Sequence, residues 1–287
     1  MMTSFINYKN ISLNNYNIEV NMNKSNNQRE DIDLKMKYYE NFIDDLEIYN
    51  HTHIFSDKIY WCWLQGFNKA PELYKAAYNS VNTSCINHSI LVINQTNLYK
   101  YVKFPSYILE KYKKKVIDNT HFSDLLRLEL LIKYGGTWID ASVLMTKYNK
   151  NFFRKDLFFF RTVNYTKISG SNWFITAEIE SPVLKTTRDL IYEYWRKENY
   201  LCDYFIFHLL FKFAFQKYYN DYLQMPYYTN IPVHFLQKHL MNKFNDTLYT
   251  NILKSASVHK LNKKFPSNNE SFIYYIIRKY MNKNNTQ

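Results

Sequence analysis

Glycine is scarce in this chain: its 287 residues include 4 glycines, and two of them stand side by side as Gly135 and Gly136. A sequence this poor in glycine does not place a pair by drift. Glycine alone adopts a positive φ without steric cost, so we expect a turn here that other residues cannot form. Helices commonly end in such a turn. The pair therefore predicts a forced helix end.

Cysteine is also scarce, with Cys62, Cys85 and Cys202 far apart in the sequence. Their odd number and wide separation exclude a disulfide framework and indicate reduced thiols in a cytosolic protein. No group of Cys and His has the spacing of zinc ligands.

Long apolar runs are missing as well. The most apolar segment, residues 204–215, is interrupted by His208 and Lys212 and is too short to span a bilayer, so we interpret it as a core helix. The first residues lack the charged-then-apolar layout of a secretory signal. We therefore expect a cytoplasmic protein, with peripheral contact at the inner face of the membrane as an open alternative.

The net charge of +12, with a pI near 9.3, favours anionic partners. Nucleotide phosphates, an anionic membrane surface and nucleic acid all qualify. Small basic clusters lie at residues 111–115 and 260–264, but no zinc-finger, helix-turn-helix or RNP pattern is present. We expect no nucleic-acid partner, although a basic nucleic-acid-binding protein remains the rival from another class.

The most informative stretch runs from Thr120 to Thr146. Its leucine-rich first half predicts a buried helix, with Ser123 as the capping residue and an acid in the first turn. After the glycine pair, residues 137–144 predict a buried strand. Alternation then puts Trp138, Asp140 and Ser142 on one face.

A buried acid needs a partner or a metal, so Asp140 is the first candidate site residue. Asp124 and Arg127 are three apart on the preceding helix and share a face. We expect these three side chains to converge at the end of the strand. The spacing fits both a binding site and a purely structural Arg–Asp network.

The remaining pattern alternates strands and helices and predicts an α/β fold. His51 and His53 stand just before the first strand. With no third ligand evident, we expect them to be surface histidines rather than metal ligands. Residues 1–30 are polar and Asn-rich. Expected strands are 58–64, 89–94, 157–163 and 172–178, and expected helices are 31–49, one from Pro71, 107–117, 182–197, 202–219, 231–241 and 272–281.

Three segments together resemble a known family: residues 59–81, 121–142 and 258–264. The pattern Ser-Asp-x-x-Arg on a helix, then Gly-Gly and an acidic strand end, resembles the capsular polysaccharide synthesis glycosyltransferases. This group is related to the larger glycosyltransferases with a DXD sugar-binding motif and to clostridial glucosylating toxins. The resemblance implies a nucleotide-sugar-binding fold of GT-A type, a Rossmann-like mixed sheet flanked by helices with extra C-terminal helices. It would occupy residues 56–287, after a polar and helical extension over residues 1–55.

The resemblance also implies roles for individual residues. Asp140 would take the first acidic position of the DXD motif, near ribose, sugar and metal, while Asp124 and Arg127 would hold sugar hydroxyls and a phosphate oxygen. The second acid is replaced by Ser142, a weak ligand for Mn²⁺ or Mg²⁺, so either Asp140 and His259 carry the metal or metal dependence is weak. Trp63, and after it Trp61, would stack on the base, with plain core tryptophans as the alternative. The other nucleotide-binding candidates are Gly66, Ser123, Tyr134, Gly136, Lys260 and Lys263.

The implied activity is transfer of a sugar from a nucleotide sugar, with UDP as the expected nucleotide. The expected acceptor is a growing surface polysaccharide, or another glycan or lipid-linked acceptor, and the anomeric configuration is retained. A toxin-like transferase that glycosylates a protein is the second enzyme hypothesis.

Overall fold

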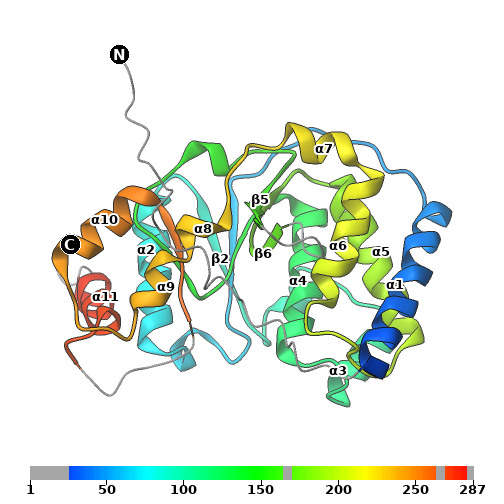
Figure 1. The fold of residues 1–287 in the computed structure, drawn as a ribbon, viewed down its shortest axis with the longest axis horizontal. Helices are drawn as coiled ribbons and strands as arrows, with labels where there is room; N and C mark the ends of the chain where they lie inside the picture. Colours follow the sequence, from blue (N-terminus) through cyan, green and yellow to red (C-terminus); the bar gives the residue numbers. More distant parts are fainter. Residues whose placement is uncertain (1–25, 164–169, 263–268, 283–287) are drawn as a thin grey trace.

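A computed structural model describes residues 26–163, 170–262 and 269–282. A central five-stranded sheet lies between two groups of helices (Figure 1). The strand order is β2-β1-β3-β6-β5, in which β2, β1 and β3 are parallel while β6 and β5 each run antiparallel to their neighbour. A second sheet pairs β4 with β7. The predicted mixed α/β sheet flanked by helices is confirmed.

Before the glycine pair, the observed helices and strands follow the predicted order. After it, one predicted strand and one predicted helix are each split in two. The strands are β1 (Lys58–Cys62), β2 (Ser89–Ile93), β3 (Gly136–Ile139), β4 (Val143–Met145), β5 (Leu157–Arg161), β6 (Gly170–Ala177) and β7 (Val258–Lys260). The helices are α1 (Asn26–Asp45), α2 (Glu72–Ser84), α3 (Ser106–Lys113), α4 (Asn119–Tyr134), α5 (Pro182–Lys197), α6 (Ile206–Lys217), α7 (Tyr219–Gln224), α8 (Asn230–Val233), α9 (Phe235–His239), α10 (Asp246–Ser255) and α11 (Phe272–Met281). Short 3₁₀ turns lie at Phe67–Lys69, Leu98–Lys100 and Lys150–Phe152.

Both faces of the sheet are buried. Tyr60 belongs to the core formed with α4, α5 and α6, whereas its neighbour Trp61 belongs to the core formed with α2 and α11. Successive side chains of a strand point to opposite faces, so a strand covered on both sides needs apolar residues throughout. This explains why β1 is apolar at every position after the exposed Lys58.

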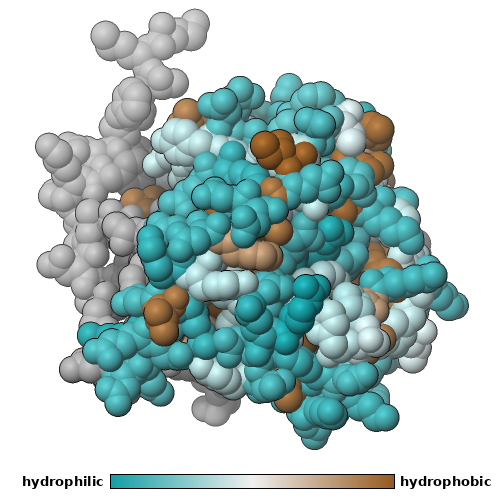
Figure 2. Space-filling view, turned by 90° about the vertical axis from the view of Figure 1, so that its right-hand side faces the viewer, coloured by the Kyte–Doolittle hydropathy of each residue, from teal (hydrophilic) through white to brown (hydrophobic). Residues whose placement is uncertain are grey.

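Helix α1 packs on the side of the molecule formed by α5 and α6 (Figure 1). Tyr39 and Ile43 are buried in the same core as those helices, and the Tyr39 ring lies 6.1 Å from that of Tyr194. The predicted helix is therefore confirmed, but it spans Asn26–Asp45, so residues 46–49 of the predicted range lie beyond its end. The outer face on this side is mostly hydrophilic, with separate apolar spots (Figure 2). The proposed domain boundary at residue 55 remains a prediction, and residues 1–25 lie outside the described chain.

The glycine pair is required, as predicted. Gly135 and Gly136 have φ angles of 60° and 95°. A Cβ on Gly136 would lie 2.3 Å from the carbonyl oxygen of Lys58, so the close pairing of β3 with β1 leaves no room for a side chain. The helix start differs from the prediction. The carboxylate of Asp118, rather than Ser123, caps α4 and accepts a 2.8 Å hydrogen bond from the His121 backbone N–H.

The strand predicted over residues 137–144 is in fact two strands. β3 ends at Ile139, and the chain turns before β4, with the Val143 N–H donating to the Asp140 carbonyl at 3.0 Å. The strand is divided because residues 143–145 pair with β7, which lies far along the sequence, and so leave the main sheet that contains β3. The helix predicted over residues 231–241 is likewise two short helices, and α7, α10 and β7 were not predicted. No helix among the described residues is long and apolar enough to cross a bilayer.

Candidate active site

A cavity of about 670 Å³ opens where β1 and β3 end. It is lined by residues 62–65 at the end of β1 and just after it, by residues 140–142 after β3 and by residues 170–173 at the start of β6. The antiparallel direction of β6 brings its first residues to the edge at which β3 finishes. Ligands of open α/β sheets bind at this edge.

Arg127 joins the two acids that the sequence singled out. Its guanidinium lies 3.0 Å from Oδ1 of Asp124 and 3.3 Å from Oδ1 of Asp140, and Nη1 donates to the Asn172 carbonyl at 2.8 Å. The side chain is 3% exposed, and the guanidinium carbon lies 5.0 Å from the centre of the Trp138 ring. The predicted convergence of Asp124, Arg127 and Asp140 is thus present at the cavity wall.

Asp140 stands between two cations. Its Oδ2 pairs with Nζ of Lys260 at 2.8 Å, and its Oδ1 also accepts from Nε1 of Trp138 at 2.8 Å. Burial alone would raise the pKa of Asp140, but Lys260 and Arg127 outweigh it and hold the pKa below its usual value. Asp140 is therefore ionised at neutral pH, and it fixes both cations at the cavity.

Asp124 has a different environment, although it shares Arg127. Burial raises its pKa to about 6, with Arg127 opposing the rise and Asp140 adding to it. Nδ2 of Asn172 donates to Oδ1 of Asp124 at 2.9 Å. The protonation state of this carboxyl therefore changes close to physiological pH.

The predicted base-stacking residues have separate places. Trp63 lines the cavity, beside Tyr74 at a ring distance of 5.2 Å. Trp61 is fully buried against Phe67 and Tyr78, which matches the core alternative.

The other predicted nucleotide contacts divide in the same way. Ser123 and Lys260 line the cavity, whereas Gly66 does not. Tyr134 and Gly136 lie at the opposite end of β3, where the Tyr134 hydroxyl donates to the Tyr101 carbonyl at 2.9 Å. Tyr134 is the last residue of α4, and Gly136 allows the close pairing of β3 with β1. Neither residue lines the cavity. Lys263 lies outside the described residues.

The predicted metal ligands do not come together. Ser142 lines the cavity with Asp140, but His259 does not. Successive residues of β7 point to opposite sides, so Lys260 faces the cavity and His259 points away from it. His259 is fully buried, and burial lowers its pKa to about 4. The prediction that His259 joins Asp140 is corrected by this alternation.

Several cavity residues were not predicted as site residues. Asn172, Tyr204, His208 and His234 line the wall. Burial, followed by the charge of Arg127, lowers the pKa of His208 to about 3, so its imidazole is neutral. One sequence signal could have found it, because His208 interrupts the most apolar run of the chain. Asn172 and His234 carry no such local signal.

This geometry defines a class of protein: an α/β protein with a charged cavity at the ends of its parallel strands. The sequence matches the family of capsular polysaccharide synthesis proteins over residues 9–280, and the chain belongs to that family. The resemblance noted in the sequence is thereby confirmed. A search of curated proteins finds no match.

Two solved structures show a weaker similarity. One is named PaToxG Glycosyltransferase: it is 15% identical, the match covers 81% of this chain and 97% of that chain, and the TM-score is 0.39. The other is described as a transferase mutant: it is 12% identical, with coverage of 61% and 88% and a TM-score of 0.31. Likenesses this weak carry no argument about the site.

Proposed function

We propose that this chain is a glycosyltransferase that binds a nucleotide sugar in the 670 Å³ cavity. The observation that carries the proposal is the row Arg127–Asp140–Lys260 at the ends of the parallel strands, in a member of a capsular polysaccharide synthesis family. Two fixed cations beside an uncharged aromatic wall suit a ligand with a diphosphate and a base.

Each part of such a donor has a candidate partner. Trp63 offers a ring for stacking on the base. Arg127 and Lys260 supply positive charge where the departing diphosphate becomes more negative. Asp124 and Asn172 offer acceptor and donor atoms for sugar hydroxyls, which would fix the orientation of the anomeric carbon. Asp140 accepts from both cations and so keeps them in place.

A divalent metal at Asp140 fits these residues poorly. Oδ2 of Asp140 already carries the Lys260 ammonium, His259 points elsewhere, and Ser142 offers only a hydroxyl. Mn²⁺ and Mg²⁺ prefer several oxygen ligands, carboxylates above all. Of the two alternatives left by the sequence, we therefore propose the one with weak metal dependence, in which Lys260 and Arg127 neutralise the diphosphate.

We propose a UDP-sugar as donor and retention of configuration, on the strength of the family resemblance. The anomeric carbon would lose its bond to the diphosphate oxygen and gain one to the acceptor oxygen on the same face. The acceptor proton would pass to the departing diphosphate. No protein nucleophile is needed, which agrees with the pairing of Asp124 and Asp140 with cations.

The proposed acceptor is a growing capsular or other surface glycan, free or lipid-linked. A second cavity adjoins the first through Asn119, and Tyr99, Tyr112, Lys113 and Lys115 line it. Aromatic rings and ammonium groups suit a sugar chain that carries a phosphate. This lining supports a glycan in preference to a protein as the proposed acceptor.

A donor screen tests the proposal. Purified protein is incubated with UDP-, GDP- and CMP-sugars, with Mn²⁺ or with EDTA, and the released nucleotide is measured. We expect slow hydrolysis of one UDP-sugar that persists in EDTA and falls by about 10²- to 10³-fold in Asp140→Ala. If no donor is hydrolysed or bound, and salt-sensitive DNA or RNA binding survives in Asp140→Ala, the nucleic-acid hypothesis replaces this one.

A further inference from the structure

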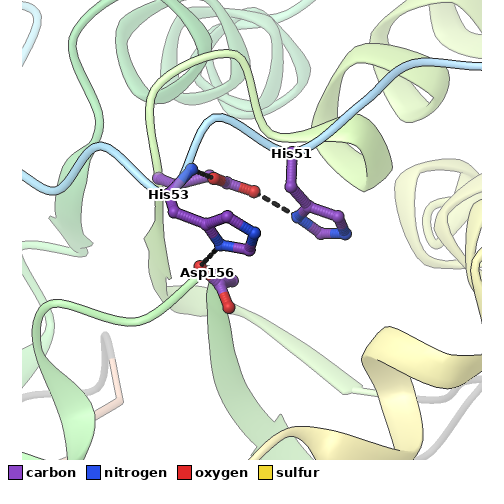
Figure 3. A group of neighbouring side chains, drawn as sticks. His51, His53 and Asp156 are labelled. Atoms are coloured by element: carbon purple, nitrogen blue, oxygen red, sulfur yellow. Dashed lines mark hydrogen bonds and ion pairs between the residues drawn. The ribbon is translucent and has the colours of Figure 1, made fainter.

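A cluster of histidines and carboxylates lies at the other end of the central sheet. His51, His53, Asp156 and Glu178 each offer one ligand atom, and these atoms all lie within 4.8 Å of one another. Figure 3 shows the two imidazoles side by side with Asp156 below them. The sequence led us to expect surface histidines without a third ligand. His53 is exposed as expected, but the expected absence of a third ligand is wrong, because Asp156 and Glu178 approach from far along the chain.

The sheet itself brings the two carboxylates together. Asp156 directly precedes β5 and Glu178 directly follows β6, and the antiparallel pair sets Leu157 opposite Ala177. The Glu178 N–H donates to the Asp156 carbonyl at 3.1 Å. Both acids are therefore held by backbone pairing of two buried strands.

The histidine segment is held against these acids by contacts that need no ion. Glu178 is fully buried, and its Oε2 accepts from the Thr52 N–H at 2.9 Å and from the His53 N–H. Its Oε1 contacts Nδ1 of His51. The buried carboxylate thus fixes the 51–53 segment before any ligand arrives.

The two imidazole rings lie close to each other. Their rings are nearly parallel, with centres 5.3 Å apart and planes 8° apart. His53 adopts a φ of 52°, a left-handed conformation that is uncommon outside glycine but is more frequent for asparagine, aspartate and histidine than for other residues. This backbone bend turns the His53 ring toward Asp156, whose Oδ1 lies 2.9 Å from His53 Nδ1.

Further contacts resemble the outer shell of a metal site. Nε2 of His51 lies 3.1 Å from Oδ2 of Asp221 on α7. Histidine ligands are commonly oriented by a carboxylate on the second ring nitrogen. His53 is 67% exposed and Asp156 is 44% exposed, so an ion can enter from solvent and keep a water.

We propose that His51, His53, Asp156 and Glu178 form a binding site for a divalent transition metal, with Zn²⁺ as the best match. Two imidazole nitrogens and two carboxylate oxygens make a donor set typical of Zn²⁺, and oxygen-seeking Mg²⁺ does not favour imidazole. The ion joins the segment after α1 to the ends of β5 and β6. It is separate from the proposed nucleotide cavity, and it adds a further link to the contacts by which Glu178 already holds residues 51–53 on the sheet.

The test is calorimetric titration of Zn²⁺ into the tag-free full chain, stripped with EDTA and without nucleotide. We expect one bound ion per chain. His53→Asn and Asp156→Asn should each weaken binding at least tenfold. Asparagine tolerates the left-handed backbone at position 53 and cannot supply the imidazole nitrogen, so this variant keeps the local conformation.

Two controls locate the ion. His88→Ala removes a histidine outside the cluster, and Asp140→Asn removes the carboxylate of the cavity; both should bind Zn²⁺ like the parent chain. Co²⁺ in place of Zn²⁺ should give visible absorption bands that His53→Asn abolishes. Absence of Zn²⁺ binding, or equal binding in His53→Asn and the parent chain, overturns the proposal. Binding lost only in Asp140→Asn would move the ion to the cavity.

Discussion

The two ends of the central sheet carry charged clusters that differ in composition: one surrounds a carboxylate with cations, and the other combines carboxylates with histidines. At the end of β3, Asp140 lies between Arg127 and Lys260 at the wall of a large cavity. At its beginning, beyond Ala177 of β6, carboxylates meet histidines on a partly exposed surface outside that cavity. The four residues of β3 separate the two by roughly 13 Å.

The difference lies in which charge is offered to a ligand. In the cavity, the carboxylates are occupied by cations, and the cations can add an anionic partner. At the other end, carboxylates and imidazoles are electron-pair donors, and they suit a cation. Asp140 follows β3, whereas Asp156 and Glu178 lie at the ends of β5 and β6 in the same sheet, so strand ends place the carboxylates and the neighbouring side chains decide the ligand.

Among variants that separate the two ends of the sheet, the largest effect is expected from removing the cation that faces the cavity. Lys260→Ala should lower kcat for donor hydrolysis by about 10²-fold, because the leaving diphosphate loses a charge and Asp140 loses a partner. Lys260→Arg should recover most of that loss. Steady-state kinetics with the donor found in the screen measures both.

The outcome that would contradict this prediction is equal activity of Lys260→Ala and the parent chain. A loss in Lys260→Ala that Mn²⁺ restores would instead show that the lysine stands where a metal can act. Zn²⁺ titration of the same variant is the control, and it should be unchanged if the two ends are independent.

The sequence predicted the cavity end well for a physical reason. Asp124, Arg127 and Asp140 lie within 17 consecutive residues, so helical spacing and one turn are enough to bring them together. Lys260 and His259 came only from the family resemblance. Their opposite orientation depends on the pairing of β7 with β4, which no local pattern revealed.

The second prediction concerns base stacking and the two tryptophans of the first strand and loop. Trp63→Ala should weaken UDP binding by about 1–3 kcal/mol, or 5- to 150-fold, since stacking on an aromatic ring is worth that much. Trp61→Phe should lower the melting temperature and leave UDP affinity unchanged, because Trp61 is buried in the core. Calorimetry with UDP and thermal unfolding separate the two effects, and weaker UDP binding in both variants would refute the assignment.

The third prediction is a pH dependence that comes from Asp124. Its raised pKa, about 6, means that the carboxyl is ionised above that pH and protonated below it. Donor affinity should fall severalfold as the pH drops below about 6, because a protonated Asp124 no longer balances Arg127 or accepts fully from a sugar hydroxyl. The diphosphate of an intact nucleotide sugar lacks the phosphomonoester group that titrates near pH 6.

Asp124→Asn supplies the control, since its donor affinity should be weak and independent of pH in this range. Loss of fold does not imitate the effect. Asp124 holds its proton more tightly in the folded chain than in the unfolded chain, so the stability it contributes is present at low pH and is lost as the pH rises through about 6. A parent chain whose donor affinity is flat from about pH 8 to 5 would exclude Asp124 from donor binding.

The metal cluster illustrates what spacing cannot reach. His51 and His53 are visible in the sequence as a histidine pair, but their partners lie 127 and 103 residues further on. Only the antiparallel pairing of β5 with β6 places Asp156 beside Glu178. The two strand ends supply the carboxylates that complete the candidate site, and no local sequence pattern links them to the histidine pair.

The smallest expected effect is on stability, and it distinguishes the two ends of the sheet without an activity measurement. Zn²⁺ at about 100 times its Kd should stabilise the folded chain by about 2.7 kcal/mol, provided that the ion binds the folded state alone. For a chain of this size the corresponding rise in Tm is on the order of 5 °C. At the same Zn²⁺ concentration, His53→Asn should reduce the rise by about half or more, because its binding is at least tenfold weaker, while Lys260→Ala should keep the full rise. A rise that His53→Asn retains in full and Lys260→Ala loses would assign the ion to the cavity and remove the distinction between the two ends.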